Sequence, residues 1–252
     1  DKALGTAFDY LEYLGTSDMT PEELKSEFYR LACTFYVSPG NERTYVVLSG
    51  LNENMPAAVQ LFEKLLADAQ VNKEAYTNMT SDILKARSDA KLNQGQNFSR
   101  LMSFAMYGPK SPATNLLTEA ELTNMNPQEL VDRIHNQNSY KHRILYYGPS
   151  SSKDLLATIN QYHQVPAALK DIPAGNEYSY LETPVTKVLV APYDAKQIYM
   201  AQISNLDKKY DPAIEPIRAL YDEYFGGGMN SIVFQEMRET RGLAYSCLLY
   251  TS

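Results

Sequence analysis

The sequence predicts an α+β fold made of modules in which a mostly antiparallel sheet packs on helices. Two alternating segments on either side of a Pro-Gly-Asn turn, at 34–38 and 43–51, predict an antiparallel hairpin. Helical periodicity with a leucine stripe dominates the next stretch, 55–138. The order helix, glycine, helix and tyrosine-containing strand occurs near both ends of the chain. It predicts a weak internal repeat whose second module is truncated.

The first module is predicted to span residues 1–163 and to begin with two helices. One covers 6–14 and ends at Gly15, because glycine is common just after the last helical residue. The other begins at a capping box formed by Thr20 and Glu23, with proline at its first helical position. The end of the first helix and the start of the second are therefore both marked by local sequence signals.

Helix breakers divide the long helical stretch, and they lie at Gly95, 108–112 and Pro127. A strand at 143–147 and a helix at 150–163 are predicted to complete the first module.

Residues 164–186 carry three prolines and a glycine without any periodicity, so they are predicted to be a linker. The second module, 187–252, is predicted to open with strands at 187–191 and 198–204. An amphipathic helix at 212–225 follows.

The C-terminal segment places an arginine and a tyrosine seven residues apart across a helix-to-strand corner. A second helix is predicted to begin at Asn230, with Arg238 near its end and Tyr245 in the next strand. Such a corner suits binding of an extended peptide backbone. The simpler alternative is that Arg238 pairs with helix carbonyls or with Glu236 or Glu239, while Tyr245 is half-buried core. The turn between the two helices consists of consecutive glycines, Gly226, Gly227 and Gly228.

Composition limits the classes of partner. The net charge is −7 and no basic cluster is present, which argues against nucleic acid and anionic membranes as ligands. No apolar run is long enough to span a bilayer, so we expect a soluble protein of the bacterial periplasm or cytoplasm. The chain ends inside a predicted strand, which is expected of a fragment. Cys33 and Cys247 are predicted to be small buried strand residues, and a disulfide between them is the less favoured alternative.

The N-terminal helix carries Asp-Tyr-Leu-Glu-Tyr at 9–13, followed by Gly15 and Thr16. This segment resembles the metal-binding helix of the insulinase-like (pitrilysin, inverzincin) zinc metallopeptidases. The glycine turn with Arg238 and Tyr245 resembles the C-terminal module of the same family, and the resemblance covers nearly the whole chain. It implies the mitochondrial processing peptidase-like fold, with repeated modules.

The sequence departs from this family at the metal site. Active members carry H-x-x-E-H, in which two histidines on one helix face bind zinc and the glutamate is the general base. Here Asp9 and Tyr13 stand at the histidine positions, Glu12 remains, and Asp82 best matches the later acidic ligand. The resemblance therefore implies that this chain binds no metal and that Tyr10 and Tyr13 fill the space of the ion. A hard-cation site of Asp9, Glu12 and Asp82 is the disfavoured alternative, because Tyr13 occupies a ligand position.

The histidines do not form a replacement motif in the sequence. His135 and His142 flank a predicted helix-to-strand turn, and His163 lies at a predicted helix end. None is paired with another histidine at helical spacing. A structural or surface role is therefore expected for all three.

The resemblance also implies a function. In the family, the Arg and Tyr of the inactive half bind substrate carbonyls and stabilise developing negative charge, while the other half supplies zinc, base and water. We expect this chain to be part of the non-catalytic half of a zinc metallopeptidase, inactive alone. Its partners would be peptides and a catalytic half on the same polypeptide or a separate subunit. One alternative is a structural paralogue, like the core subunits of respiratory complexes, and another is a peptide-binding module without a partner half.

Overall fold

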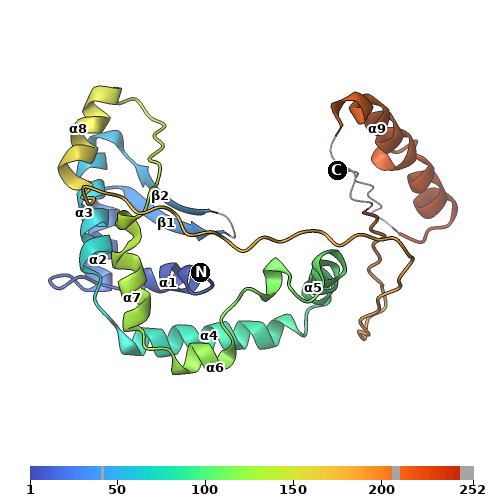
Figure 1. The fold of residues 1–252 in the computed structure, drawn as a ribbon, viewed down its shortest axis with the longest axis horizontal. Helices are drawn as coiled ribbons and strands as arrows, with labels where there is room; N and C mark the ends of the chain where they lie inside the picture. The colour runs from blue at the N-terminus through green and yellow to red at the C-terminus, as the bar shows by residue number, and fades with distance from the viewer. Residues whose placement is uncertain (41–42, 206–210, 245–252) are drawn as a thin grey trace. The chain divides into compact units, whose positions relative to one another are not determined.

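The computed structural model describes residues 1–40, 43–205 and 211–244. The chain forms two compact units, whose elements are labelled in Figure 1. The first unit consists of Asp1–Leu181 and Val185–Ile203, and the second of Glu182–Pro184 and the described residues from Ser204 onward. The division into homologous modules at 163 and 186 stays a prediction.

The first unit begins with helices and one hairpin and continues with helices. Its α-helices and strands are, in chain order, α1 (Leu4–Leu11), α2 (Pro21–Arg30), β1 (Cys33–Pro39), β2 (Thr44–Gly50), α3 (Met55–Asp68), α4 (Lys73–Ala90), α5 (Gln94–Tyr107), α6 (Glu119–Asn124), α7 (Gln128–His135) and α8 (Ser152–Tyr162). This mixture confirms the predicted α+β class. The predicted breaks at 108–112 and at Pro127 lie between helices, but Gly95 lies inside α5, and the break between α4 and α5 comes earlier, between Ala90 and Gln94.

The predicted hairpin is confirmed. β1 and β2 pair antiparallel in a register that sets Cys33 opposite Gly50 and Phe35 opposite Leu48. Alternate residues of β1 face the helices, since Cys33 is buried and Phe35 stacks obliquely on Phe62 of α3 with ring centroids 5.0 Å apart. One face of the hairpin therefore contributes to the core.

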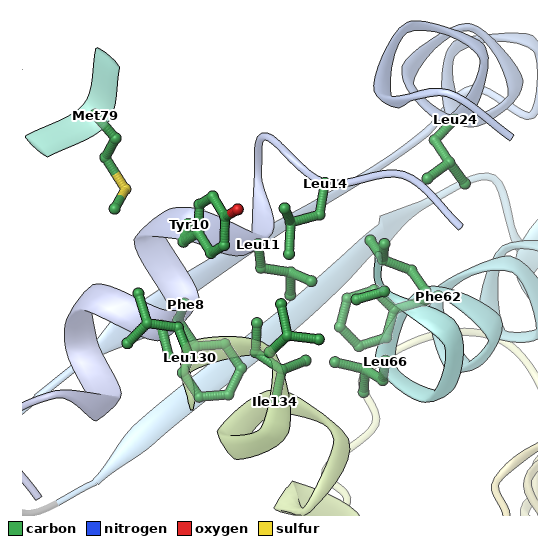
Figure 2. Close-up of a cluster of buried hydrophobic side chains, with 14 of the residues drawn as sticks. Phe8, Tyr10, Leu11, Leu14, Leu24, Phe62, Leu66, Met79, Leu130 and Ile134 are labelled. Carbon is green, nitrogen blue, oxygen red and sulfur yellow. The ribbon is translucent and has the colours of Figure 1, made fainter. Parts of the chain in front are cut away.

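The hydrophobic core of the described residues lies between Ala3 and Ile134. Figure 2 shows α1 contributing Phe8 and Leu11 to a cluster that contains Leu130 and Ile134 of α7. Leu11 and Leu130 are fully buried. The core thus holds α1, the helix that resembles a metal-binding helix, against the rest of the first unit.

The predicted end of the first helix is wrong. α1 ends at Leu11, and the chain continues in tighter turns in which Tyr13 N–H donates to Tyr10 O and Leu14 N–H to Leu11 O. Gly15 is not a left-handed helix cap. It is needed because a Cβ there would lie 2.3 Å from the carbonyl oxygen of Met19.

Local capping signals were more reliable. Thr20 and Glu23 form the predicted capping box at α2, with Thr20 Oγ1 accepting from the Glu23 N–H at 3.2 Å. Ser151 caps α8 by accepting from the Asp154 N–H.

The strands predicted at 143–147, 187–191 and 198–204 are absent from the described residues. Their apolar side chains face solvent: Leu145 is 83% exposed and Val188 is 83% exposed. An extended segment becomes a strand only when a neighbour accepts and donates its backbone hydrogen bonds, and no such neighbour pairs with these segments in the parts of the chain described.

The regular elements of the second unit are helical and lie between Pro212 and Thr240 in the described residues. A 3₁₀ turn at Pro212–Ile214 leads into α9 (Glu215–Asp222), and a π-helical turn, η5 (Glu223–Gly227), extends it. A second helical segment ends in another π-helical turn, η6 (Phe234–Thr240). The helix predicted to break before Gly226 therefore continues through Gly227.

Candidate functional site

The exposed face of α1 and its C-terminal turn carries the metal-motif positions. Asp9, Glu12 and Tyr13 are all exposed, as expected for residues three and four apart on one helical face. Burial of its surroundings, and secondarily the charge of Glu12, raise the pKa of the Asp9 carboxyl above its ordinary value. A carboxylate, Asp9, and a phenol, Tyr13, thus stand at the two histidine positions of the family motif, and Glu12 stands at the position of its general base.

Tyr10 lies on the opposite face of α1 and is fully buried. Its hydroxyl donates to the carbonyl oxygen of Asn72 at 2.6 Å and accepts from the Asn72 N–H at 2.9 Å. Its ring meets the Tyr76 ring edge to face, with centroids 5.6 Å apart. The Tyr10 side chain therefore joins α1 to the beginning of α4. That it fills the space of a lost ion stays a prediction.

Tyr13 does not share this role. Its side chain is 44% exposed, so the prediction that it fills the space of a lost ion is wrong.

Asp82 lies on an exposed part of α4. Within the described residues, no group of three or more His, Cys, Asp or Glu side chains is placed to hold a metal ion. Asp9, Glu12, Tyr13 and Asp82 therefore do not fit a zinc ion of the family type, which needs convergent imidazole or thiolate ligands.

Of Gly227 and Gly228 in the glycine turn, only Gly227 is close to other backbone, since a Cβ there would lie 3.1 Å from the carbonyl oxygen of Asp222. A Cβ on Gly227 or Gly228 would also approach the Glu223 carboxylate, at 2.7 and 3.1 Å, but that flexible side chain can move aside. Gly228 is extended, and Ser231 then begins the next helical segment by accepting from the Phe234 N–H at 3.3 Å. The second helix thus starts at Ile232, two residues beyond the predicted Asn230.

Arg238 lies within η6. Its guanidinium stacks on the Phe234 ring at 4.8 Å, and its Nε lies 3.5 Å from a carboxylate oxygen of Glu239. The side chain is 36% exposed. Tyr245 and Cys247 lie outside the described residues, so the predicted pairing of Arg238 with Tyr245 stays a prediction. Cys33 is a buried free thiol whose pKa is raised by that burial.

Sequence reasoning missed a cluster of two histidines and a glutamate in the first unit. The Nε2 atoms of His142 and His163 are 2.8 Å apart, and His163 Nδ1 lies 2.6 Å from a carboxylate oxygen of Glu63. His163 is 21 positions from His142 and 100 positions from Glu63 in the sequence. No local spacing could have revealed them, because the packing of α8 on α3 brings them together.

No family model matches the chain. It is 20% identical to an uncharacterized zinc protease of Rickettsia felis, covering 100% of this chain and 60% of that protein. It is 24% identical to an uncharacterized zinc protease of Streptomyces coelicolor, covering 99% of this chain and 56% of that protein. The chain thus spans less than two thirds of the length of these bacterial relatives.

Among solved structures, the inactive domain of an M16 peptidase from Pseudomonas fluorescens matches with a TM-score of 0.59 at 15% identity. The match covers 95% of this chain and 58% of that one. The structural match shows that the chain has the fold of M16 peptidase domains. Together with the curated relatives it confirms the resemblance to the insulinase-like zinc peptidases. No helix in the described part of the chain is long and apolar enough to cross a membrane.

Proposed function

We propose that this chain is part of the non-catalytic half of a zinc metallopeptidase. The observation that carries the proposal is the face of α1 and its following turn, which presents Asp9, Glu12 and Tyr13 where an active half presents H-x-x-E-H. Carboxylate and phenol at these positions replace both imidazoles, and the arrangement does not fit a catalytic zinc site. Similarity to proteins named zinc proteases along the whole chain supports the same assignment.

The catalytic half would lie on the same polypeptide or on a separate subunit. It would supply zinc, the general base and the attacking water, and this chain would supply chamber wall and contacts to the peptide. Purified alone, with zinc added, the chain should cleave no peptide; zinc-dependent cleavage by the chain alone would overturn the proposal.

Arg238 and Tyr245 are the substrate-binding residues in this proposal. A guanidinium and a phenol both donate hydrogen bonds, so each can bind a peptide carbonyl and stabilise the oxyanion that forms when water attacks. Stacking on Phe234 restricts the Arg238 side chain, and its 36% exposure lets a ligand reach it.

The test uses the assembled enzyme with both halves present. Arg238→Ala or Tyr245→Phe should lower kcat/KM by about 100- to 1000-fold, the range found when one oxyanion donor is removed, with zinc content unchanged. The matched control is Arg241→Ala, because Arg241 is exposed and only 3.4 Å from the Glu236 carboxylate. Turnover that is unaffected by both Arg238→Ala and Tyr245→Phe would exclude the substrate-binding role.

A structural paralogue is the second candidate, and the local contacts of Arg238 favour it. An arginine that stacks on Phe234 and approaches Glu239 can serve η6 alone. In that case Arg238→Ala should lower the melting temperature of the chain without changing turnover in any assembly that contains it. Loss of turnover at an unchanged melting temperature would reject this candidate.

A further inference from the structure

His142, His163 and Glu63 form a connected cluster at the end of α8. His163 follows the last residue of α8, and its side chain is only 11% exposed. Glu63 belongs to α3 and is similarly covered, with 16% of its side chain exposed. His142 lies in the segment before α8 and is exposed. The cluster therefore has one face buried between helices and one face open to solvent.

The Nδ1 atom of each histidine is hydrogen-bonded to an oxygen that acts as an acceptor. His142 Nδ1 lies 2.7 Å from the carbonyl oxygen of Tyr140, so this nitrogen must carry a proton. His163 Nδ1 lies 2.6 Å from the Glu63 carboxylate, and it carries a proton when that carboxylate is ionised. In the neutral form of each ring, the Nε2 atom then presents a lone pair.

These two lone pairs point at the same place. The Nε2 atoms are 2.8 Å apart, and the ring planes are inclined at 85°. Two lone pairs at this distance repel each other unless a cation lies between them. The cation can be a shared proton or a metal ion.

The surroundings match those of metal-binding histidines. Such histidines almost always donate their second ring N–H to a carboxylate or a backbone carbonyl, which fixes the tautomer and orients the ring. Here the Glu63 carboxylate accepts from His163, and the Tyr140 carbonyl oxygen accepts from His142. The second oxygen of Glu63 accepts from Asn138 Nδ2 at 2.9 Å, so the carboxylate is itself held in place.

The backbone next to His142 is also fixed. Lys141 N–H donates to Lys170 O at 2.9 Å, and Lys170 N–H donates to Ser139 O at 2.8 Å. These bonds form an isolated parallel bridge between Tyr140 and Lys170. Both histidines are thus positioned by structure that does not depend on the interaction between their rings.

We propose that His142 and His163 bind one divalent transition-metal ion through their Nε2 atoms, at a site separate from the α1 motif. Imidazole nitrogen favours zinc, copper and nickel over magnesium and calcium. With Zn–N bonds of about 2.0–2.1 Å in tetrahedral geometry, the two nitrogens would stand roughly 3.3 Å apart. The rings must therefore separate by about half an ångström, a movement open to the exposed His142 ring. Water molecules complete the coordination on the solvent side.

The test is calorimetric titration of the full chain with zinc chloride, with magnesium chloride as the negative control. We expect one zinc per chain, no binding of magnesium, and at least a tenfold loss of zinc affinity in His142→Asn and in His163→Asn. His135→Asn is the matched control, because His135 Nε2 lies 3.1 Å from Ala69 O, in a different contact. Zinc affinity should be unchanged in this variant.

A second variant separates the role of Glu63 from folding. Glu63→Gln keeps the shape of the side chain but weakens its acceptance from His163, and outer-sphere partners typically contribute 10- to 100-fold in affinity. We expect a loss in that range with an unchanged circular dichroism spectrum. Absence of zinc binding to the folded chain would overturn the proposal, and so would binding that survives both His142→Asn and His163→Asn.

Discussion

Two parts of the first unit have similar alternating sequences and different structures. Residues 1–140 contain the hairpin and every buried hydrophobic side chain of the described chain, whereas 141–181 and 185–203 contain α8 and extended segments with exposed valines and leucines. β1 and β2 exchange backbone hydrogen bonds, and α3 covers one face through Phe62. The comparison teaches that alternation makes a strand only where a second strand and a covering helix are both present.

The second part is held at separate points. Leu181 N–H donates to Met106 O at 2.7 Å, and the Tyr180 ring stacks on Tyr107 of α5 with centroids 4.8 Å apart. Farther along, the Tyr199 ring meets Phe98 at 5.5 Å. These extended segments thus contact α5 through single aromatic side chains and do not form the continuous hydrogen bonds of a sheet.

The largest difference between the two parts should come from leucine truncation. Leu11→Ala removes a fully buried side chain and should lower the free energy of unfolding by about 2–5 kcal/mol. Leu145→Ala removes an 83% exposed side chain and should change it by less than about 0.5 kcal/mol. Urea denaturation followed by circular dichroism measures both. A comparable loss in Leu145→Ala would show that 143–147 is buried in solution and would remove the contrast.

The second prediction compares the stability effects of removing the hydroxyl of buried Tyr10 and of exposed Tyr13. Tyr10→Phe deletes a hydroxyl that bonds both backbone groups of Asn72, leaving a buried donor and acceptor unpaired at a cost of about 1–3 kcal/mol. Tyr13→Phe deletes a hydroxyl from a 44% exposed side chain and should have almost no effect. Chemical denaturation of the two variants side by side provides the measurement, and equal stabilities would contradict the placement of Tyr10.

The smallest expected effect is on the pH dependence of stability, and it compares two ion pairs. Lys2, followed by the backbone and hydroxyl of Thr118, lowers the pKa of the Glu121 carboxyl to about 2. Because the folded-state pKa lies below the ordinary 4.5, this carboxylate stabilises the fold above about pH 4.5, and the contribution is lost as the pH falls toward 2. Glu121→Gln should therefore reduce the dependence of stability on pH in that range.

The control for this ion pair lies in the second part of the unit. Lys141 and Asp171 also form a pair, but their side chains are 61% and 86% exposed. Asp171→Asn should leave the acid unfolding profile unchanged, because exposed pairs contribute little. Acid titration of the unfolding midpoint distinguishes the two variants, and identical profiles would remove the distinction between the parts.

Local signals in the sequence were sufficient for some elements. The capping box at Thr20 and the antiparallel pair of β1 and β2 involve residues close in sequence, so their patterns could be recognised directly. The strands at 143–147, 187–191 and 198–204 were mispredicted because strand formation depends on a partner elsewhere in the chain.

The candidate site was predictable to a similar extent. Replacement of two histidines by Asp9 and Tyr13 is visible in the sequence, but which of two tyrosines turns inward depends on where α1 ends. His142 and His163 could not be paired from sequence, because α8 must first pack against α3.

The double hydrogen bond between Tyr10 and Asn72 joins α1 to the start of α4 with protein atoms alone. In an H-x-x-E-H half, an ion links the corresponding helix to a later one, so a chelator acts on the scaffold as well as on the chemistry. On the proposed function, removal of zinc would inactivate the catalytic half, whereas this half would keep its fold. It could then function again with a catalytic half to which zinc has been restored.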